Sequence, residues 1–594
     1  MTSSSGMWDN PPVLTLSRFF MNSSPKTHDG RALPLFCLFL SGAASLVYEL
    51  VWIKQLSLIF GGTLYAISAV LCAFMGGLAL GAWAVQRVLH RLEATGRGWD
   101  LVWVYGLLEG AIGMYGLAFP HGLALLEKLY PAAMHAELAA GPLLHGLEFI
   151  LSALLMLPAT LLMGATLPLI GSWSIGGRAG SVFADVSLLY SLNTLGAVFG
   201  CLYTQWFAVE NFGIRGTTLT AVAMNGLVLL LCFVHRKRTL PRPEAACRGH
   251  ARPADLDTPG GEEPAPSRFE SLLLLFIFVY SGMAALASEI LWTRVLVFPL
   301  GSSLYSFALI LATFLFSIAL GSLIAEKALG NSRWALKFLA VELAIGAAAI
   351  AILPLFNQVP EWTLRADQSF YAVENTPSRT LLVRSLFAFG LMFPPALGFG
   401  LAFPLAHRVH LSLFGTVSRT LGNSYALNTL GAVAGTFLTP FLFIPWLGIR
   451  LSLFVIFAGL ILLAAFGLVV HLRARPGTAA AALAACALGI AGGFLYADPV
   501  VSTQHLGENN LARTEITDDK TRARLLAYKE GDFSTLSVVE DLGTGARTLY
   551  VDGFSTATVS RSFGGSAYME AMGFVPMALH PAPQKALVIC FGTG

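Results

Sequence analysis

The stretch SGAASLVYELVWIKQLSLIFGGTLYAISAVLCAFMGGLALGAW, from Ser41 to Trp83, decides the fold. It holds two apolar runs, and a run of about 20 apolar residues is long enough to cross the hydrocarbon core of a bilayer. A second copy, SGMAALASEILWTRVLVFPLGSSLYSFALILATFLFSIALGSL, begins 240 residues later at Ser281. Further along, YSLNTLGAVFG from Tyr190 matches YALNTLGAVAG from Tyr425. Two separated blocks of matching sequence predict a duplicated membrane protein.

Segments of spanning length occur six times in each half. They run over 34–60, 64–86, 101–120, 147–172, 188–209 and 216–234, and over 271–298, 303–325, 335–356, 382–406, 421–446 and 449–470. Because each unit holds an even number of spans, both copies point the same way through the membrane, as in the parallel repeats of major-facilitator transporters. The predicted fold class is mainly α: a polytopic bundle of two parallel six-helix repeats, then a small β-rich segment leading into an incomplete Rossmann-like α/β domain.

This interpretation divides the chain into six segments. They are a polar N-terminal tail (1–33), the first repeat (34–235), a linker (236–270), the second repeat (271–471), an additional Ala-rich membrane helix (478–497) and a soluble tail (524–594).

Composition supports the membrane class. Of 594 residues, 55% are hydrophobic and 12% are charged, about half the charged fraction of an average soluble domain. A net charge of +3 gives no indication of nucleic acid as a partner. The seven cysteines form no CxxC pair, so neither a disulfide framework nor a metal site is expected. The first residues are polar as far as Arg31, so we expect no cleaved leader.

Basic residues predict the orientation, because cytoplasmic loops carry an excess of Lys and Arg. Such residues precede the first span and follow spans two, six, ten and twelve. This places both ends of the twelve-helix bundle, and the N-terminus, in the cytoplasm of a multi-pass protein of the cell or inner membrane. If 478–497 crosses the bilayer, the tail emerges on the other side; if it lies along the membrane or forms a re-entrant hairpin, the tail is cytoplasmic. The lipid bilayer is the one partner this predicts, and oligomeric state is not indicated.

Charged residues lie inside the first span of each half. Glu49 and Lys54 occupy the first, and Glu289 and Arg294 occupy the equivalent places in the second. Charges in hydrocarbon cost a few kcal/mol each and normally pair or face a cavity. The functional interpretation is a proton- or substrate-linked site between the halves. The structural interpretation is an internal salt bridge, or a glutamate near the end of a span with Lys54 or Arg294 reaching the membrane surface.

Asparagines recur in the LNTLGAV motif of each half, at Asn193 and Asn428. An asparagine in a membrane helix can hydrogen-bond a neighbouring helix and hold a bundle together. We expect this structural role over a functional one.

The tail changes character from about residue 524. LLAYKEGDFSTLSVVED alternates apolar and polar residues, Gly543-Thr544-Gly545 supplies a turn and RTLYVDG follows, which predicts a β-hairpin. SAYMEAMGFVPMALH has helical spacing. In KALVICFGTG, an apolar run precedes Gly592 and Gly594, as where the first strand of a nucleotide fold meets its ligand loop.

In this order, the pieces resemble spermidine synthases, the aminopropyltransferases. YKEGDFSTLSVVED resembles the opening of their small β domain, Asp552 in YVDG their Leu-Asp-Gly element, and Tyr568-Met569-Glu570 their Tyr-His-Glu helix. With the bundle ahead of it, the chain resembles the membrane-fused members of that family.

The resemblance implies a donor, decarboxylated S-adenosylmethionine, whose aminopropyl group passes to an amine. It implies that Gly592, Gly594 and Asp552 lie at the donor site, and that Tyr568 and Glu570 contact the amine. The chain departs from the family pattern at Ser534, Thr556, Gly564, Gly565 and Met569, which weakens the expectation of a polyamine as the acceptor. The catalytic aspartate is expected beyond Gly594, so the chain as given is expected to be C-terminally truncated.

Two other functions remain open on the sequence. The twelve spans and paired intramembrane acids also fit a transporter of polyamine-like or related small solutes. Alternatively, the bundle is a membrane scaffold for an inactive synthase-like tail.

Overall fold

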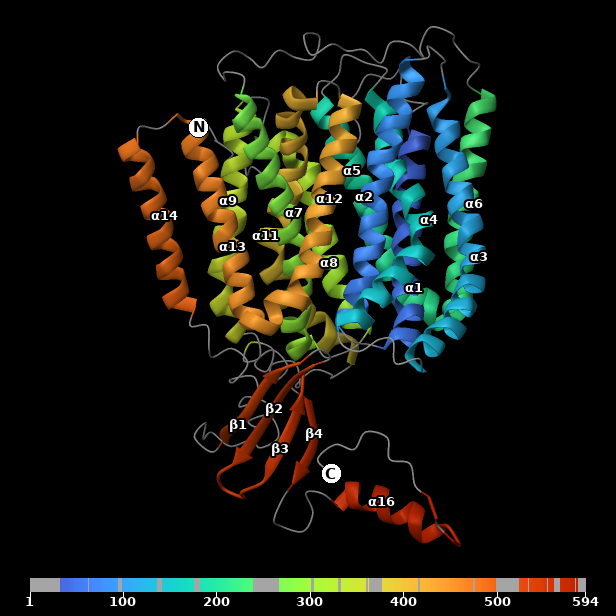
Figure 1. Cartoon of the computed structure of the whole chain (residues 1–594), viewed down its shortest axis with the longest axis vertical. Helices are drawn as coiled ribbons and strands as arrows, with labels where there is room; N and C mark the ends of the chain where they lie inside the picture. Colours follow the sequence, from blue (N-terminus) through green and yellow to red (C-terminus); the bar gives the residue numbers. More distant parts are fainter. Residues whose placement is uncertain are drawn as a thin grey trace, which may run out of the picture.

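The computed structural model is an upright helical bundle with a small sheet below one end (Figure 1). It describes residues 32–61, 64–94, 99–135, 142–175, 182–238, 266–300, 304–329, 333–358, 362, 377–414, 417–473, 476–497, 523–531, 534–552, 554–559, 567–582 and 584–585.

Six long helices form each half of the bundle, and each predicted span falls largely within one of them. The first half consists of α1 (Ala32–Phe60), α2 (Leu64–Ala94), α3 (Leu101–His135), α4 (Pro142–Ile175), α5 (Val182–Tyr203) and α6 (Val209–Arg238). The second consists of α7 (Arg268–Leu300), α8 (Leu304–Leu329), α9 (Trp334–Ile352), α11 (Pro377–Phe414), α12 (Val417–Leu438) and α13 (Ile444–His471). The short 3-10 helix η3 (Leu353–Asn357) extends α9. The predicted membrane bundle is confirmed.

Glycines break the longest helical runs. Among the described residues, ten helical runs are long and apolar enough to cross a membrane, and two of these, Asp185–Lys237 and Arg419–His471, contain 53 residues each. An unbroken helix of that length would extend about 80 Å, more than twice the thickness of a bilayer core. Each run instead holds a π-helical segment, η2 (Thr204–Ala208) or η4 (Thr439–Phe443), followed by a glycine outside helical geometry. Gly213 has φ 63° and Gly448 has φ 72°, a conformation that other residues adopt only with strain.

Close contacts between glycine and backbone join the helices within each half. A Cβ atom at Gly42 would lie 2.1 Å from the carbonyl oxygen of Asn193, and one at Gly282 would lie 2.3 Å from that of Asn428. The first contact packs α1 against α5, and the second packs α7 against α12 in the same way. Because lipid tails are as apolar as leucine, such small-residue contacts rather than apolar burial hold membrane helices together. The repeated sequence thus produces a repeated helix pair.

The two halves meet along α2 with α12 and α5 with α8. At the end where α7 begins, Ser322 donates a hydrogen bond to the carbonyl of Ser187 at 3.2 Å. At the other end the equivalent tyrosines of the two repeats each cross to the opposite half. The Tyr65 ring packs at a tilt of 38° against Phe441 with ring centroids 4.8 Å apart, and Tyr305 donates a hydrogen bond to Glu210. The halves are therefore in contact at both ends.

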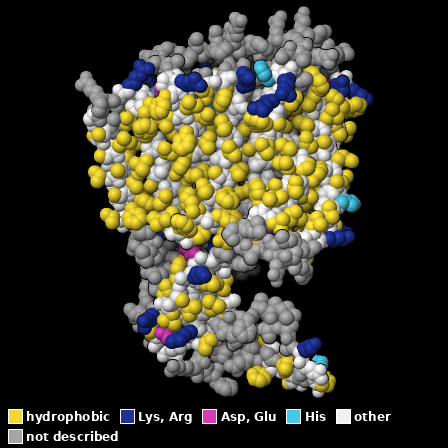
Figure 2. Space-filling model, in the orientation of Figure 1, with side chains coloured by type: hydrophobic (Ala, Val, Ile, Leu, Met, Phe, Trp, Pro, Cys, Tyr) yellow, Lys and Arg dark blue, Asp and Glu magenta, His cyan; other side chains and the backbone are white. Residues whose placement is uncertain are grey.

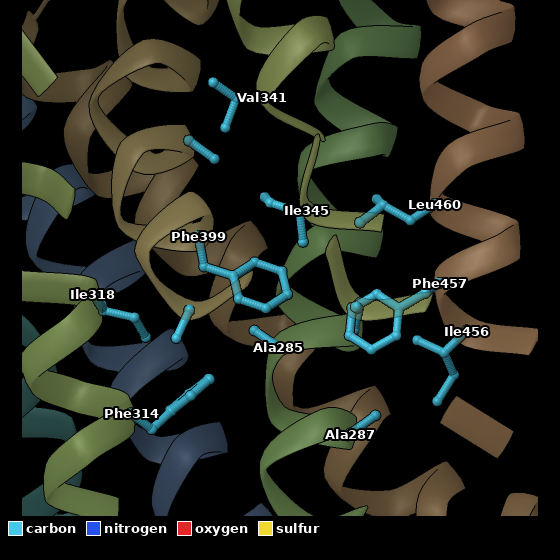
Figure 3. Packing of buried hydrophobic residues seen from close by; sticks show 14 of the residues in the cluster. Ala285, Ala287, Phe314, Ile318, Val341, Ile345, Phe399, Ile456, Phe457 and Leu460 are labelled. Atoms are coloured by element: carbon cyan, nitrogen blue, oxygen red, sulfur yellow. The ribbon is translucent and has the colours of Figure 1, made fainter. Parts of the chain in front are cut away.

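Apolar side chains fill the second half and cover the outside of the bundle. Figure 3 shows Phe314, Phe399 and Phe457 packed between the helices of the second half. Figure 2 shows a broad apolar band on the outer surface, with Lys and Arg gathered at its upper end. A belt of this kind is what lipid contact requires.

A further helix, α14 (Pro476–Ala497), runs alongside α13 (Figure 1). Phe494 packs edge-on against Phe454 with ring centroids 5.1 Å apart. Its 22 residues correspond to about 33 Å, enough to cross a bilayer core. Beyond it the sheet lies at the bundle end where α7 finishes, opposite the end where α7 begins (Figure 1).

The tail begins with a four-stranded antiparallel sheet in the order β1 (Ala523–Glu530), β2 (Thr535–Asp541), β3 (Arg547–Val551) and β4 (Phe554–Val559). The predicted glycine turn connects β2 to β3, where Gly545 has φ 68° and its N–H donates to the carbonyl of Asp541 at 2.7 Å. The predicted helix is α16 (Ala567–Leu579). The strand expected in KALVICFGTG falls mostly on residues 586–594, which lie outside the described part of the chain.

Candidate functional site

Glu49 and Glu289 come together between the two halves. Glu49 lies on α1 and is 6% exposed; Glu289 occupies the equivalent turn of α7. The two carboxyl groups act on each other electrostatically, and both act on Cys201 of α5. The Cys201 thiol in turn donates to the carbonyl of Ala308 on α8, with the sulfur and oxygen 3.3 Å apart. The two acids thus lie where α1, α5, α7 and α8 converge.

The basic residues near these acids are used elsewhere. Lys54 is exposed, and Arg294 donates to the tail as described below. Among the ion pairs within the described part of the chain, none joins Glu49 or Glu289 to a basic side chain. Both interpretations of these four residues stay predictions.

The asparagines of the LNTLGAV motifs lie at contacts between helices. Asn428 donates from its side-chain amide to the carbonyl of Phe278 on α7 at 3.0 Å. Asn193 presents its own carbonyl to Gly42 on α1. Both positions are where a hydrogen bond between helices would stabilise the bundle.

Two contacts join the bundle to the tail. Arg294, at the end of α7, donates to the carbonyl of Gly531 at 2.8 Å. The backbone N–H of Ile449, which the break at Gly448 leaves outside the helix, donates to the Glu530 carboxylate at 2.8 Å. Tyr528 donates to the other oxygen of that carboxylate at 2.7 Å. The β1–β2 turn is therefore held directly on the second half of the bundle.

Asp552 lies at the β3–β4 turn, close to this junction. It has φ 50°, and its carboxylate accepts a hydrogen bond from the N–H of Thr535 at 2.8 Å. Burial raises the pKa of Asp552, and the Thr535 N–H and the positive charge of Arg294 oppose that rise. Asp552, which is expected at the donor site, thus holds the backbone of Thr535 in this structure. Arg294, which also binds Gly531, favours the ionised form of the Asp552 carboxyl group.

The remaining tail residues are placed only in part. Tyr568 and Glu570 belong to α16, and their side chains lie outside what the structure describes. Gly592 and Gly594 lie beyond the described residues. The expected donor and amine contacts of these four residues stay predictions. Within the described residues, no group of three or more His, Cys, Asp or Glu side chains could hold a metal ion.

The sequence interpretation missed a buried polar network inside the first half. Glu109 on α3 is fully buried, and its two oxygens accept hydrogen bonds from Ser41 at 2.5 Å and from the Asn225 amide at 2.6 Å. Tyr48 donates to the same asparagine at 2.9 Å. A signal was present: LLEGAIG around Glu109 matches AVELAIG around Glu342 in the second half.

Comparison with known proteins gives one relative in sequence. No family model matches the chain. The chain is 25% identical over 219 residues to polyamine aminopropyltransferase 1 of Streptomyces coelicolor, which covers 36% of each chain. The chain therefore spans about a third of the length of this curated relative. Because the predicted tail is shorter than the matched region, the match reaches into the membrane part of this chain.

Solved transporters share the outline of the bundle. A bacterial homologue of the iron transporter ferroportin in an outward-facing state is 15% identical, covers 74% of this chain and 98% of its own, and has a TM-score of 0.46. The Escherichia coli fucose:proton symporter FucP is 12% identical and covers 73% of this chain and 98% of its own, with a TM-score of 0.41. At these values the likeness says nothing about what this chain binds.

The contact between Arg294 and the β1–β2 turn predicts that substituting Arg294 and substituting its equivalent, Lys54, have different effects. Arg294→Ala removes a charged donor from the Gly531 carbonyl, and a hydrogen bond to a charged group contributes about 1.5–3 kcal/mol. Since Arg294 is only partly buried, we expect the free energy that stabilises the contact between the sheet and the bundle to fall by about 1–2 kcal/mol. Amide hydrogen exchange in β1 and β2 should become about tenfold faster.

The matched control is Lys54→Ala, the same position in the first repeat, where the described part of the tail makes no hydrogen bond or ion pair. It should leave exchange in the sheet unchanged. Equal exchange rates in the two variants would contradict the assignment of Arg294 to the junction.

Proposed function

We propose that this protein is a membrane-embedded aminopropyltransferase-like protein whose tail forms the first part of the transferase domain. The observation that carries the proposal is the match to a polyamine aminopropyltransferase over 219 residues. That match extends into the membrane region, which favours a relative that shares the bundle as well as the tail. The tail contributes the family's elements in the expected order: sheet, YVDG turn and helix α16.

The proposed reaction moves an aminopropyl group from decarboxylated S-adenosylmethionine to an amine. The amine nitrogen attacks the carbon next to the sulfonium, the carbon–sulfur bond breaks, methylthioadenosine leaves and the amine loses a proton. In this proposal Gly592, Gly594 and Asp552 belong to the donor site, and Tyr568 and Glu570 contact the amine. A base is needed to keep the attacking amine neutral.

A second function is favoured by the acids inside the bundle. Glu49 and Glu289 lie close enough between the halves for Glu289 to act electrostatically on Glu49, and neither has an ion pair with a basic side chain among the described residues. Carboxyl groups in such a position mark cation or proton pathways in many transporters. We propose that the bundle moves small organic amines, the same chemical class that the tail would use.

The distribution of basic residues favours a cytoplasmic N-terminus. Lys and Arg gather at the upper end of the apolar band (Figure 2). Arg87, Arg236 and Arg408 lie in the last turns of α2, α6 and α11, which end where α7 begins. The positive-inside rule assigns this end to the cytoplasm. With α14 as a further crossing, the sheet then lies on the non-cytoplasmic side. An amine carried by the bundle would therefore arrive at the tail's side of the membrane.

The transferase proposal predicts release of methylthioadenosine. Purified full-length protein in lipid nanodiscs, given decarboxylated S-adenosylmethionine and spermidine, putrescine or a simpler diamine, should release it at a rate that depends on the amine. Chromatography coupled to mass spectrometry measures the product. No release with any of the amines would overturn the proposal.

The transport proposal predicts a loss of flux when the paired acids are neutralised. Proteoliposomes with wild-type protein should accumulate radiolabelled spermidine, and Glu49→Gln with Glu289→Gln should reduce the rate about tenfold or more, because a cation in the low-dielectric interior loses its countercharge. Glu127→Gln, at an exposed position of α3, is the matched control. Flux equal to the control in the double variant would exclude this pathway.

The proposed orientation predicts the location of the tail. Alkaline phosphatase, which is active only outside the cytoplasm, should be active when fused after Tyr496, and a green fluorescent protein fused there should stay dark. The same fusions after Arg238 should show the opposite pattern. Fluorescence at Tyr496 would place the tail in the cytoplasm and make α14 a non-crossing segment.

A further inference from the structure

A second fully buried glutamate, Glu342, lies inside the other half of the bundle. It occupies the ninth position of α9, just as Glu109 occupies the ninth position of α3. The flanking residues match as well, because Ala-Ile-Gly follows two positions after each glutamate. Ser41 and Ser281, at equivalent positions of α1 and α7, accompany the two acids. The duplication therefore placed one carboxyl group and one hydroxyl group at the same site in each half.

The hydrogen-bond donors around the two acids differ. In the first half Asn225 donates to Glu109 at 2.6 Å. The GIR motifs that begin at Gly213 and Gly448 align Asn225 with Leu460. The match of α3 with α9 aligns Tyr105 with Phe338. Leu460 and Phe338 are both fully buried. The second half thus kept the acid and replaced two polar neighbours with apolar ones.

The surroundings of Glu342 are accordingly apolar. Figure 3 shows Leu460 on α13 extending toward Ile345 on α9, one turn after Glu342, with Val341 in the same cluster. Within the described residues, neither carboxyl oxygen of Glu342 has a partner at hydrogen-bond geometry. Ser281 is the one described side chain that influences the carboxyl group, and it is uncharged.

Charged neighbours do not compensate Glu342. Helix α9 packs against α7, α11, α13 and α14. The ionisable side chains described on these helices are Arg268, Glu270, Tyr280, Glu289, Arg294, His407, Arg408, His410, Arg450, His471 and Cys486. None of them acts on Glu342. Lys337, on α9 itself, lies instead over the Trp334 ring.

We infer that Glu342 is a proton-binding site within the membrane, whereas Glu109 is a fixed hydrogen-bonded carboxylate. An unpaired carboxylate in an apolar interior is too costly to persist, so the group takes a proton or a cation. A small metal cation needs several oxygen ligands, and the described neighbours of Glu342 supply one hydroxyl group. Glu109, by contrast, accepts two hydrogen bonds from neutral donors, which favours its ionised, acceptor-only form.

A carbodiimide distinguishes the two states. Dicyclohexylcarbodiimide enters membranes and reacts with protonated carboxyl groups: the acid proton moves to a carbodiimide nitrogen, the carboxyl oxygen bonds to the central carbon, and an acyl shift to nitrogen leaves a stable N-acylurea. At neutral pH, exposed carboxyls are ionised. Peptide mapping of the labelled full chain by mass spectrometry should find Glu342 modified at least about tenfold more than Glu109.

Exchanging the neighbours between the halves is the matched test. Leu460→Asn gives Glu342 an amide donor equivalent to Asn225, and labelling of Glu342 should fall about tenfold. Asn225→Leu removes that donor in the first half, and Glu109 should become labelled. Labelling that follows neither exchange would overturn the inference.

Glu342→Gln covers the case in which an exchanged variant fails to fold, because it keeps the size and shape of the side chain. The infrared band of protonated carboxyl groups, identified by its shift in heavy water, should lose intensity in Glu342→Gln relative to the wild type, because one contributing group is removed. An unchanged band would contradict the inference. Protection of Glu342 from the carbodiimide by Na⁺ at constant pH would instead assign the site to a metal cation.

Discussion

The absence of water from the bilayer core is the constraint on which this structure depends. Every backbone N–H and C=O must find a partner within the protein, so the chain crosses as helices. The two places where a helix leaves regular geometry, Gly213 and Gly448, lie at bundle ends rather than in the middle of a span. At Gly448 the freed N–H of the next residue, Ile449, is bonded by Glu530 of the tail. The soluble part of the chain thus completes a hydrogen bond that the membrane part cannot make alone.

The same constraint separates what duplication preserved from what it changed. Contacts between glycine and backbone are equivalent in both halves, as at Gly42 and Gly282. They were preserved because even a Cβ atom would collide with the neighbouring backbone there. The polar positions differ between the halves: Lys54 is exposed, whereas the equivalent residue of the second half, Arg294, binds the tail. In a bilayer, a substitution of this kind changes the hydrogen-bond or charge partner of a polar group, and no water is present to take that partner's place. The differences between the halves therefore indicate where this protein acquired properties beyond those of a symmetric bundle.

Hydropathy and the repeat predicted the bundle, the order of its helices and the glycine turn of the sheet, because these depend on local pattern. The meeting of Glu49 with Glu289 was one of two open interpretations, since a sequence does not show which way a side chain faces between packed helices. Glu109 and Glu342 were missed for a definable reason. The spacing between the halves is 240 residues in the first two helices but 233 at these acids, because α2 and its following loop are longer than α8 and its loop. Alignment at one fixed spacing does not bring the two acids together.

The position of the tail follows from the second half alone. Arg294 lies near the end of α7 and Ile449 follows the break in α13 at Gly448, and the β1–β2 turn is hydrogen-bonded to both through Gly531 and Glu530. The first half offers Lys54 and Ile214 at the equivalent places, yet α14 continues from α13 and leads the chain to the second half. Since α7 and α13 belong to the same half, a movement of one half against the other would carry the sheet as a rigid attachment of the second half. Any coupling between the bundle and the tail must therefore act through the surface that the first half presents to the sheet, or through local changes at Gly448, where the helix is already broken.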